Sequence, residues 1–91
     1  MKTLIRVTEI WVPNKQRTHL EFFEGLYGEL AEFKGASESM VFAYGEGMPG
    51  KAWATRRPVI LHSFDNSYFL RTEAAQKAGL TAGIALPIFA G

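Results

Sequence analysis

The sequence contains no cysteine, and this absence removes several classes of site at once. Without thiols there is no disulfide framework, no zinc ribbon, no cysteine nucleophile and no thioether-linked chromophore. Asp65 is the single aspartate, and His19 and His62 have no third metal-type ligand near them in sequence. We recognise no sequence motif that pairs a nucleophile with a general base. We therefore expect no catalytic residue, no metal and no cofactor, and the protein is not expected to be an enzyme.

A strong excess of charge and a long hydrophobic run are also missing. Ten basic residues against nine acidic ones give a net charge of +1, so the composition does not indicate a nucleic-acid-binding protein. The longest uncharged run, residues 78–91, is interrupted by Gly79, Gly83 and Pro87, which argues against a membrane span. The short apolar pair Leu4-Ile5 is no secretory signal, and we expect a cytoplasmic protein.

What is present suits one small domain over residues 1–91, with 47% hydrophobic and 21% charged residues. Period-two alternation and β-branched residues predict strands, and the change to a period near 3.6 predicts helices. The predicted strands are Leu4–Val12, Thr18–Phe23, Met40–Tyr44, Val59–Leu61 and Thr81–Phe89. The predicted helices are Leu26–Phe33 and Thr72–Ala78, with a helical turn at Lys51–Thr55. This order predicts an α+β fold, a central antiparallel sheet covered by short helices.

Two local features support this assignment. The polar segment Pro13–Arg17 separates the first two strands and predicts an antiparallel hairpin. Thr72 is a suitable N-cap for the last helix, and Gly79 is placed to end it, with Leu80 packing back on its last turn.

The glycine-rich segment 45–51 allows three interpretations. It satisfies G-x-G-x-x-G, but Pro58 leaves room for only about two helical turns after Gly50, too few for a dinucleotide-binding crossover. It also fits a phosphate loop except at Ala52, where such a loop needs Ser or Thr to hold magnesium. The third interpretation is a tight turn with Pro49 and Gly50 at its centre, and this one is favoured.

A longer series of motifs resembles the GAF-type sensory domain. The matching segments are Glu9–Pro13, Phe42, Gly45–Trp53, Arg57–Leu61, Phe69–Arg71, Ala78–Leu80 and Ala85–Ile88. The resemblance implies a GAF/profilin-like sheet with a small molecule held between one sheet face and the helices and loops that follow the second strand. It also implies a role in signal transduction, with a fused or associated effector such as a histidine kinase.

The resemblance further implies that the domain is incomplete at both ends. A family member of roughly 150 residues has an additional N-terminal helix, a further strand and a C-terminal helix. In the family sheet that strand lies between the first strand and the one containing Ala85–Ile88. We therefore expect two strand edges to face a gap, and we expect a homodimer or strand-exchanged oligomer to fill it.

Specific ligands are not identified by the sequence. The bilin-binding and methionine sulfoxide reductase types of the family work through cysteine, and the cyclic-nucleotide type carries an Asp-Glu pair that is missing here. The second half of the chain has a net charge of +3 and the first half −2, so an anionic small molecule would prefer the second half. The candidate ligand-binding residues are Trp11, Tyr44, Trp53, His62, Phe69 and Arg71.

Each of these side chains also has a structural interpretation. The aromatic residues could close the core, His62 could be a hydrogen-bonded structural histidine, and Arg71 could be solvated or ion-paired. An alternative function is a ligand-free dimerisation scaffold in which Ile84, Leu86 and Phe89 contact a partner.

Overall fold

The computed structural model describes residues 5–64 and 67–88, which form two antiparallel sheets backed by three helices. The elements in order are β1 Thr8–Pro13, β2 His19–Leu26, α1 Ala31–Glu38, β3 Val41–Ala43, α2 Gly47–Thr55, β4 Val59–Leu61, α3 Thr72–Lys77 and β5 Gly83–Ala85. The fold is α+β, with short helices and antiparallel strands, as predicted. None of the helices in these described ranges is long and apolar enough to cross a membrane.

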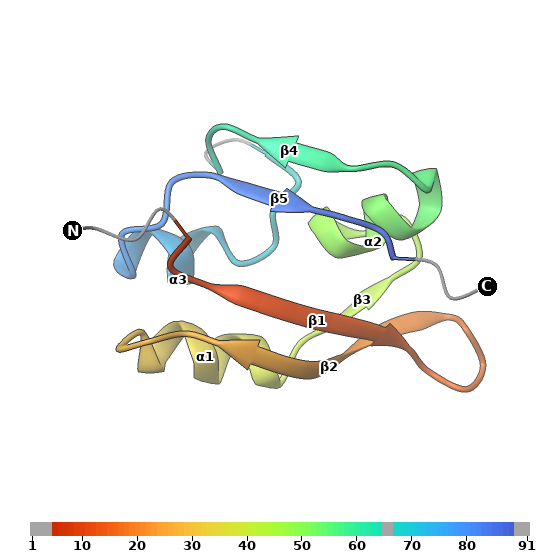
Figure 1. The fold of residues 1–91 in the computed structure, drawn as a ribbon, viewed down its shortest axis with the longest axis horizontal. Helices are drawn as coiled ribbons and strands as arrows, with labels where there is room; N and C mark the ends of the chain where they lie inside the picture. The colour runs from red at the N-terminus through yellow and green to blue at the C-terminus, as the bar shows by residue number, and fades with distance from the viewer. Residues whose placement is uncertain (1–4, 65–66, 89–91) are drawn as a thin grey trace.

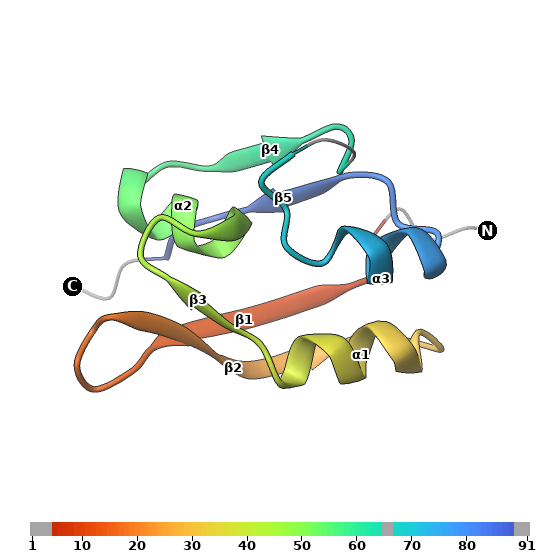
Figure 2. The same cartoon turned by 180° about the vertical axis from the view of Figure 1, so that it is seen from behind.

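The strands divide into a three-stranded sheet in the order β1-β2-β3 and a two-stranded sheet of β4 and β5. Figures 1 and 2 show β1 and β5 side by side, pointing the same way, with the helices on one side of both sheets. Within the described residues each of these two strands is paired on one side only, β1 with β2 and β5 with β4. The expected gap in the sheet, between the first strand and the last, is therefore confirmed.

The β1–β2 hairpin forms where it was predicted, because Asn14 organises its turn. The Asn14 side-chain oxygen accepts hydrogen bonds from the backbone N–H groups of Thr18 (2.9 Å) and His19 (3.3 Å). Arg17 takes a positive φ of 57° inside the turn. A β-bulge between Ile10 and Trp11 shifts the register of the hairpin.

The predicted helix at Leu26–Phe33 is wrong. Leu26 is the last residue of β2 and is exposed, Gly28 has a φ of +58°, and α1 begins only at Ala31. Gly28 takes the left-handed conformation that glycine adopts without steric cost, so the chain turns before it becomes helical. Of the apolar residues at helical spacing, only Leu30 and Phe33 pack against the core.

The glycine-rich segment also differs from its predicted turn. Gly50 lies inside α2, which starts at Gly47, and Pro49 occupies the first turn of this helix. Proline is tolerated there because the first N–H groups of a helix have no intrahelical partner. The glycines serve close packing, since a Cβ on Gly50 would lie closer than 3.0 Å to the Ala43 carbonyl oxygen and one on Gly47 would overlap the Phe42 ring.

The end of α3 agrees with its prediction more closely. Gly79 follows the helix with a φ of +76°, and the Leu80 N–H donates to the Ala75 carbonyl (2.8 Å), which closes the last turn. The N-cap position belongs to Arg71, not to Thr72. The Thr72 hydroxyl instead donates backwards to the Phe69 carbonyl (2.8 Å) and thereby fixes the loop that carries Arg71.

The core lies between the sheets and the helices. Its buried cluster consists of Tyr27, Phe33, Met48, Phe64, Phe69 and Ala75. Phe64 and Phe69 stack with ring centroids 4.0 Å apart. Each predicted strand other than Val59–Leu61 is displaced or trimmed by a few residues, and the predicted strand Thr81–Phe89 retains only Gly83–Ala85 as a strand among its described residues.

We predict that Gly50→Ala lowers the free energy of unfolding by about 1–3 kcal/mol, because the new methyl group overlaps the rigid Ala43 backbone. The matched control is Gly35→Ala, since Gly35 lies in the middle of α1 and a Cβ at this position would meet nothing within 4 Å. That change should stabilise the protein by about 0.5–1 kcal/mol. Urea unfolding of both variants checks the pair, and equal stability of the two variants would contradict the packing argument.

Candidate functional site

A trough separates the facing edges of β1 and β5, and we call it the inter-sheet trough. Its volume is about 930 Å³, and α2 and the loop that carries Phe69 and Arg71 form its base. The side chains that line it are mainly aliphatic and aromatic, including Trp11, Phe33, Met48, Phe64 and Phe69. A concave apolar surface of this size with a few polar groups is typical of a small-molecule site.

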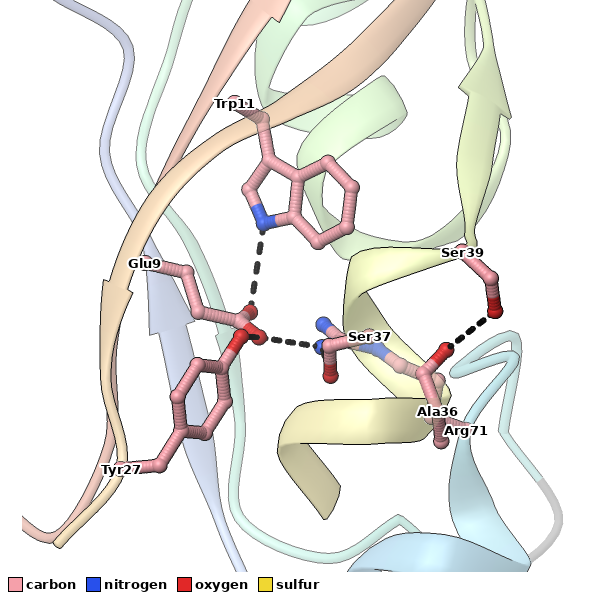
Figure 3. Close-up of polar contacts among 7 residues, drawn as sticks. All are labelled: Glu9, Trp11, Tyr27, Ala36, Ser37, Ser39 and Arg71. Carbon is pink, nitrogen blue, oxygen red and sulfur yellow. Dashed lines mark hydrogen bonds and ion pairs between the residues drawn. The ribbon is translucent and has the colours of Figure 1, made fainter. Parts of the chain in front are cut away.

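The polar centre of the trough is an ion pair between Glu9 of β1 and Arg71, which are 62 residues apart in sequence. The Arg71 Nη1 donates to the Glu9 Oε2 at 2.7 Å and also to the Ser37 hydroxyl at 2.7 Å. The Trp11 indole N–H donates to the Glu9 Oε1 at 3.2 Å, and the Tyr27 hydroxyl donates to the other carboxylate oxygen. Figure 3 shows the Trp11, Tyr27 and Arg71 side chains converging on the Glu9 carboxylate.

Aromatic rings surround the Arg71 guanidinium. Its central carbon lies 5.0–5.4 Å from four ring centroids, those of Trp11, Phe33, Phe42 and Phe69. Each ring face attracts the cation, and the attraction is stronger away from water. The Arg71 Nε is buried and lacks a hydrogen-bond partner among the described residues, so these ring contacts are the environment that holds it.

Burial and the hydrogen bonds around Glu9 shift the pKa values of Glu9 and Tyr27. Burial raises the pKa of Glu9, but the hydrogen bonds and charge of Arg71, together with the Tyr27 and Trp11 donors, outweigh burial, and the pKa lies below its ordinary value. Burial and the hydrogen bond to Glu9 raise the pKa of the Tyr27 hydroxyl. At neutral pH the site therefore holds an ionised Glu9 carboxylate beside a neutral Tyr27 phenol.

The structure brings five of the six predicted ligand residues together. Trp11, Trp53, His62, Phe69 and Arg71 line the inter-sheet trough. Tyr44 lies outside the trough lining. It is exposed, packs edge-to-face on Trp53 with ring centroids 5.0 Å apart, and donates its hydroxyl to the Ala54 carbonyl (3.3 Å).

The sequence interpretation missed three polar members of the site, Glu9, Tyr27 and Ser37. Glu9 could have been found from the sequence. In the period-two alternation of a strand it lies on the same inward face as Trp11, where a carboxylate is unusual. Ser37 is fully buried in α1 and Tyr27 sits after β2. Neither position could be linked to Arg71 without the tertiary fold.

The glycine-rich segment does not form a phosphate cradle. The Glu46 carboxylate accepts a hydrogen bond from the Ala43 N–H (3.3 Å) at the start of α2, where it would repel a phosphate. The Lys51 ammonium lies 4.7 Å from the centre of the Tyr68 ring. Among the described residues, no group of three potential metal ligands comes together.

We predict that Arg71→Leu destabilises the protein by about 3–5 kcal/mol, because Glu9 then remains buried without its cation. The double variant Glu9→Leu/Arg71→Leu removes both charges and should recover more than half of this loss. Urea unfolding of the three proteins forms the test. A double variant that is less stable than Arg71→Leu would show that the pair does not depend on mutual neutralisation.

We also predict a pH dependence carried by Glu9. Because its folded pKa is lowered, its stabilisation is present above the ordinary glutamate pKa of about 4.3 and is lost as the pH falls through the folded value. The free energy of unfolding of the unmodified protein should therefore fall more steeply on acidification than that of Glu9→Gln. Parallel slopes for the two proteins between neutral pH and about pH 3 would contradict the assignment.

The family model of the GAF domain matches residues 6–91. The comparison with curated proteins returned no match.

Proposed function

This chain belongs to the GAF domain family, and from that premise we propose that it binds a small molecule in the inter-sheet trough and relays binding to an effector domain or protein. The family is commonly involved in signalling and ligand sensing. The observation that carries the proposal for this chain is the trough itself, because its base joins an apolar surface to the Glu9–Arg71 pair. We propose a binding role without catalysis.

The distribution of charge indicates the class of ligand. The described lining includes four arginines, Arg6, Arg17, Arg56 and Arg71, against the single carboxylate of Glu9. Glu9 is already paired with Arg71, and the guanidinium groups of Arg6 and Arg17 add positive charge to the trough lining. An anionic molecule with an apolar, preferably aromatic body fits this combination of arginines and aromatic rings.

The position of the trough between two separately paired sheets supports the proposed relay. Each wall belongs to its own set of backbone hydrogen bonds, β1-β2-β3 on one side and β4-β5 on the other. A ligand that contacts both walls favours one separation of the two sheets over others. We propose that this change in separation is the signal, and that it reaches an effector such as a histidine kinase, fused or associated.

The alternative function is a ligand-free dimerisation scaffold. Ile84 and Leu86 are 58% and 62% exposed, so two of the three residues proposed for that contact are available, while Phe89 lies outside the described residues. A sensor predicts a closed, partly polar cavity near Trp53 and Arg71, whereas a scaffold predicts that side chains fill this space. Both residues line a trough that is open, so the cavity is not closed. Because the space is not filled by side chains, it supports the ligand-binding proposal over the scaffold.

We predict that the protein binds anilinonaphthalene sulfonate, an anionic aromatic probe, at one site per chain. Ala85→Phe should weaken this binding roughly tenfold or more, because Ala85 lines the trough and a phenyl ring occupies it. Thr81→Trp fills the trough from a second lining position and should act in the same direction. Probe fluorescence gives the affinity, and circular dichroism checks that each variant is folded.

The matched control is Val41→Phe, because Val41 is a half-exposed apolar residue that does not line the trough. It should leave probe affinity unchanged. Equal weakening by Val41→Phe, or full binding to both folded trough variants, would contradict the site. Native mass spectrometry of the purified protein can then identify a bound metabolite.

A further inference from the structure

Two arginines adopt a backbone conformation that arginine rarely takes. Within residues 5–64 and 67–88, the non-glycine residues with a positive φ are Arg17 (57°) and Arg56 (60°). A residue with a Cβ is strained in this left-handed region, whereas glycine and asparagine adopt it more readily. Such strain is characteristic of positions that are kept for function. Both turns therefore carry an arginine where glycine or asparagine would form the same turn with less strain.

Tyr44 connects the two turns. Its backbone N–H donates to the Thr18 carbonyl (3.2 Å), which is next to Arg17 in the hairpin. Its hydroxyl donates to the Ala54 carbonyl (3.3 Å), two residues before Arg56. Figure 1 shows the β1–β2 turn and the turn between α2 and β4 at the same end of the molecule. One tyrosine therefore spans the space between the two arginine-bearing turns.

Two more cations and a second aromatic ring belong to the same surface. The Trp53 ring packs edge-to-face on Tyr44, with ring centroids 5.0 Å apart. All members of the surface are exposed except Trp53, which is half-buried. We call this surface the hairpin-end patch, and it consists of Lys15, Arg17, Tyr44, Trp53, Arg56 and Arg57.

The positive charge of the hairpin-end patch is concentrated and largely uncompensated. The patch holds four of the ten basic residues of the chain. In the described part of the chain, Lys15, Arg17 and Arg57 form no ion pair. The helix α1, which carries Glu32 and Glu38, lies toward the opposite end of the molecule (Figure 1). A cluster of one sign on one end steers a partner of the opposite charge toward it.

The aromatic rings and the limited extent of the patch favour a short acidic peptide over a nucleic acid. Arginine, tyrosine and tryptophan are the side chains that contribute most to protein–protein binding, and guanidinium groups bind carboxylates through paired N–H donors. Glu46 is exposed only two residues after Tyr44, and the net charge of the whole chain is +1. A nucleic-acid strand would extend beyond the patch to surface that does not attract its phosphates.

We propose that the hairpin-end patch is a docking surface for an acidic segment of a partner polypeptide. Carboxylates of that segment pair with the arginines, and one of its apolar side chains packs on the two aromatic rings. This interaction goes beyond the small-molecule proposal and does not depend on it. The members of the patch outside the lining of the inter-sheet trough are Lys15, Tyr44 and Arg57, so the two proposals can be tested separately.

The probe is the fluorescein-labelled peptide Glu-Glu-Phe-Glu-Glu-amide, and its control has glutamine in place of every glutamate. Fluorescence anisotropy measures affinity, and amide NMR shifts locate the bound peptide. The acidic peptide should shift the Tyr44 amide and the amides of the hairpin turn, and its affinity should fall as salt is added. The glutamine peptide should bind at least tenfold more weakly, because it lacks all four carboxylates.

Lys15→Glu tests the patch without altering the trough lining. It should weaken the acidic peptide roughly fivefold to tenfold, since a repulsion replaces an attraction. The matched control is Lys34→Glu, the same change of charge at an exposed position of α1, and it should leave peptide affinity within about twofold. Both variants should bind the sulfonate probe like the unmodified protein, because neither residue lines the trough.

Arg17→Asn tests why an arginine occupies a left-handed position. Asparagine adopts this conformation with less strain, so the variant should be at least as stable to urea as the unmodified protein. It should nevertheless bind the acidic peptide roughly threefold to fivefold more weakly. A loss of stability with unchanged peptide affinity would mean that Arg17 serves the turn alone, and this result would overturn the proposal.

Equal affinity of Lys15→Glu and Lys34→Glu for the acidic peptide would also overturn it, as would equal binding of the glutamate and glutamine peptides. Tighter binding of a labelled twelve-nucleotide oligothymidylate than of the acidic peptide would assign the patch to nucleic acid instead. Since the sulfonate probe reports on the trough, failure of the peptide and failure of the small-molecule site give different results.

Discussion

The ion pair between Glu9 and Arg71 connects the two halves of this protein. Glu9 belongs to β1, Ser37 to α1, and Arg71 to the loop before α3, so one guanidinium joins elements 34 and 62 residues away from it. Burying a charge without a partner costs several kcal/mol, and this cost makes the three elements interdependent. The four surrounding rings exclude water from the guanidinium, and their faces attract its positive charge.

The Glu9–Arg71 pair lies in the trough between β1 and β5, which belong to separate sheets. The core packs between the helices and the sheets, but no backbone hydrogen bonds in the described residues join β1 to β5. The resulting trough has apolar and charged side chains at its base, and the unpaired edges of β1 and β5 border it.

The sequence predicted well those features that depend on local physical chemistry. The hairpin turn depends on hydrogen bonds to the Asn14 side chain, and the end of α3 depends on the positive φ of Gly79. Asparagine and glycine are the residue types that favour these conformations, so both features can be predicted from the sequence. The helix predicted at Leu26–Phe33 was wrong, although Leu26, Leu30 and Phe33 have helical spacing. Leu26 ends a strand and Gly28 forms a turn, so the helix begins only at Ala31. Tertiary packing, not spacing, decided which of these residues is buried.

By itself the sequence determined the α+β class and the order of most elements. Of the six residues it proposed for a ligand site, all but Tyr44 line one trough. Only the tertiary structure decided that Glu9, Tyr27 and Ser37 complete that site. The reason is physical: residue type and spacing report local backbone preference, whereas an ion pair across 62 residues exists only after distant elements have packed together.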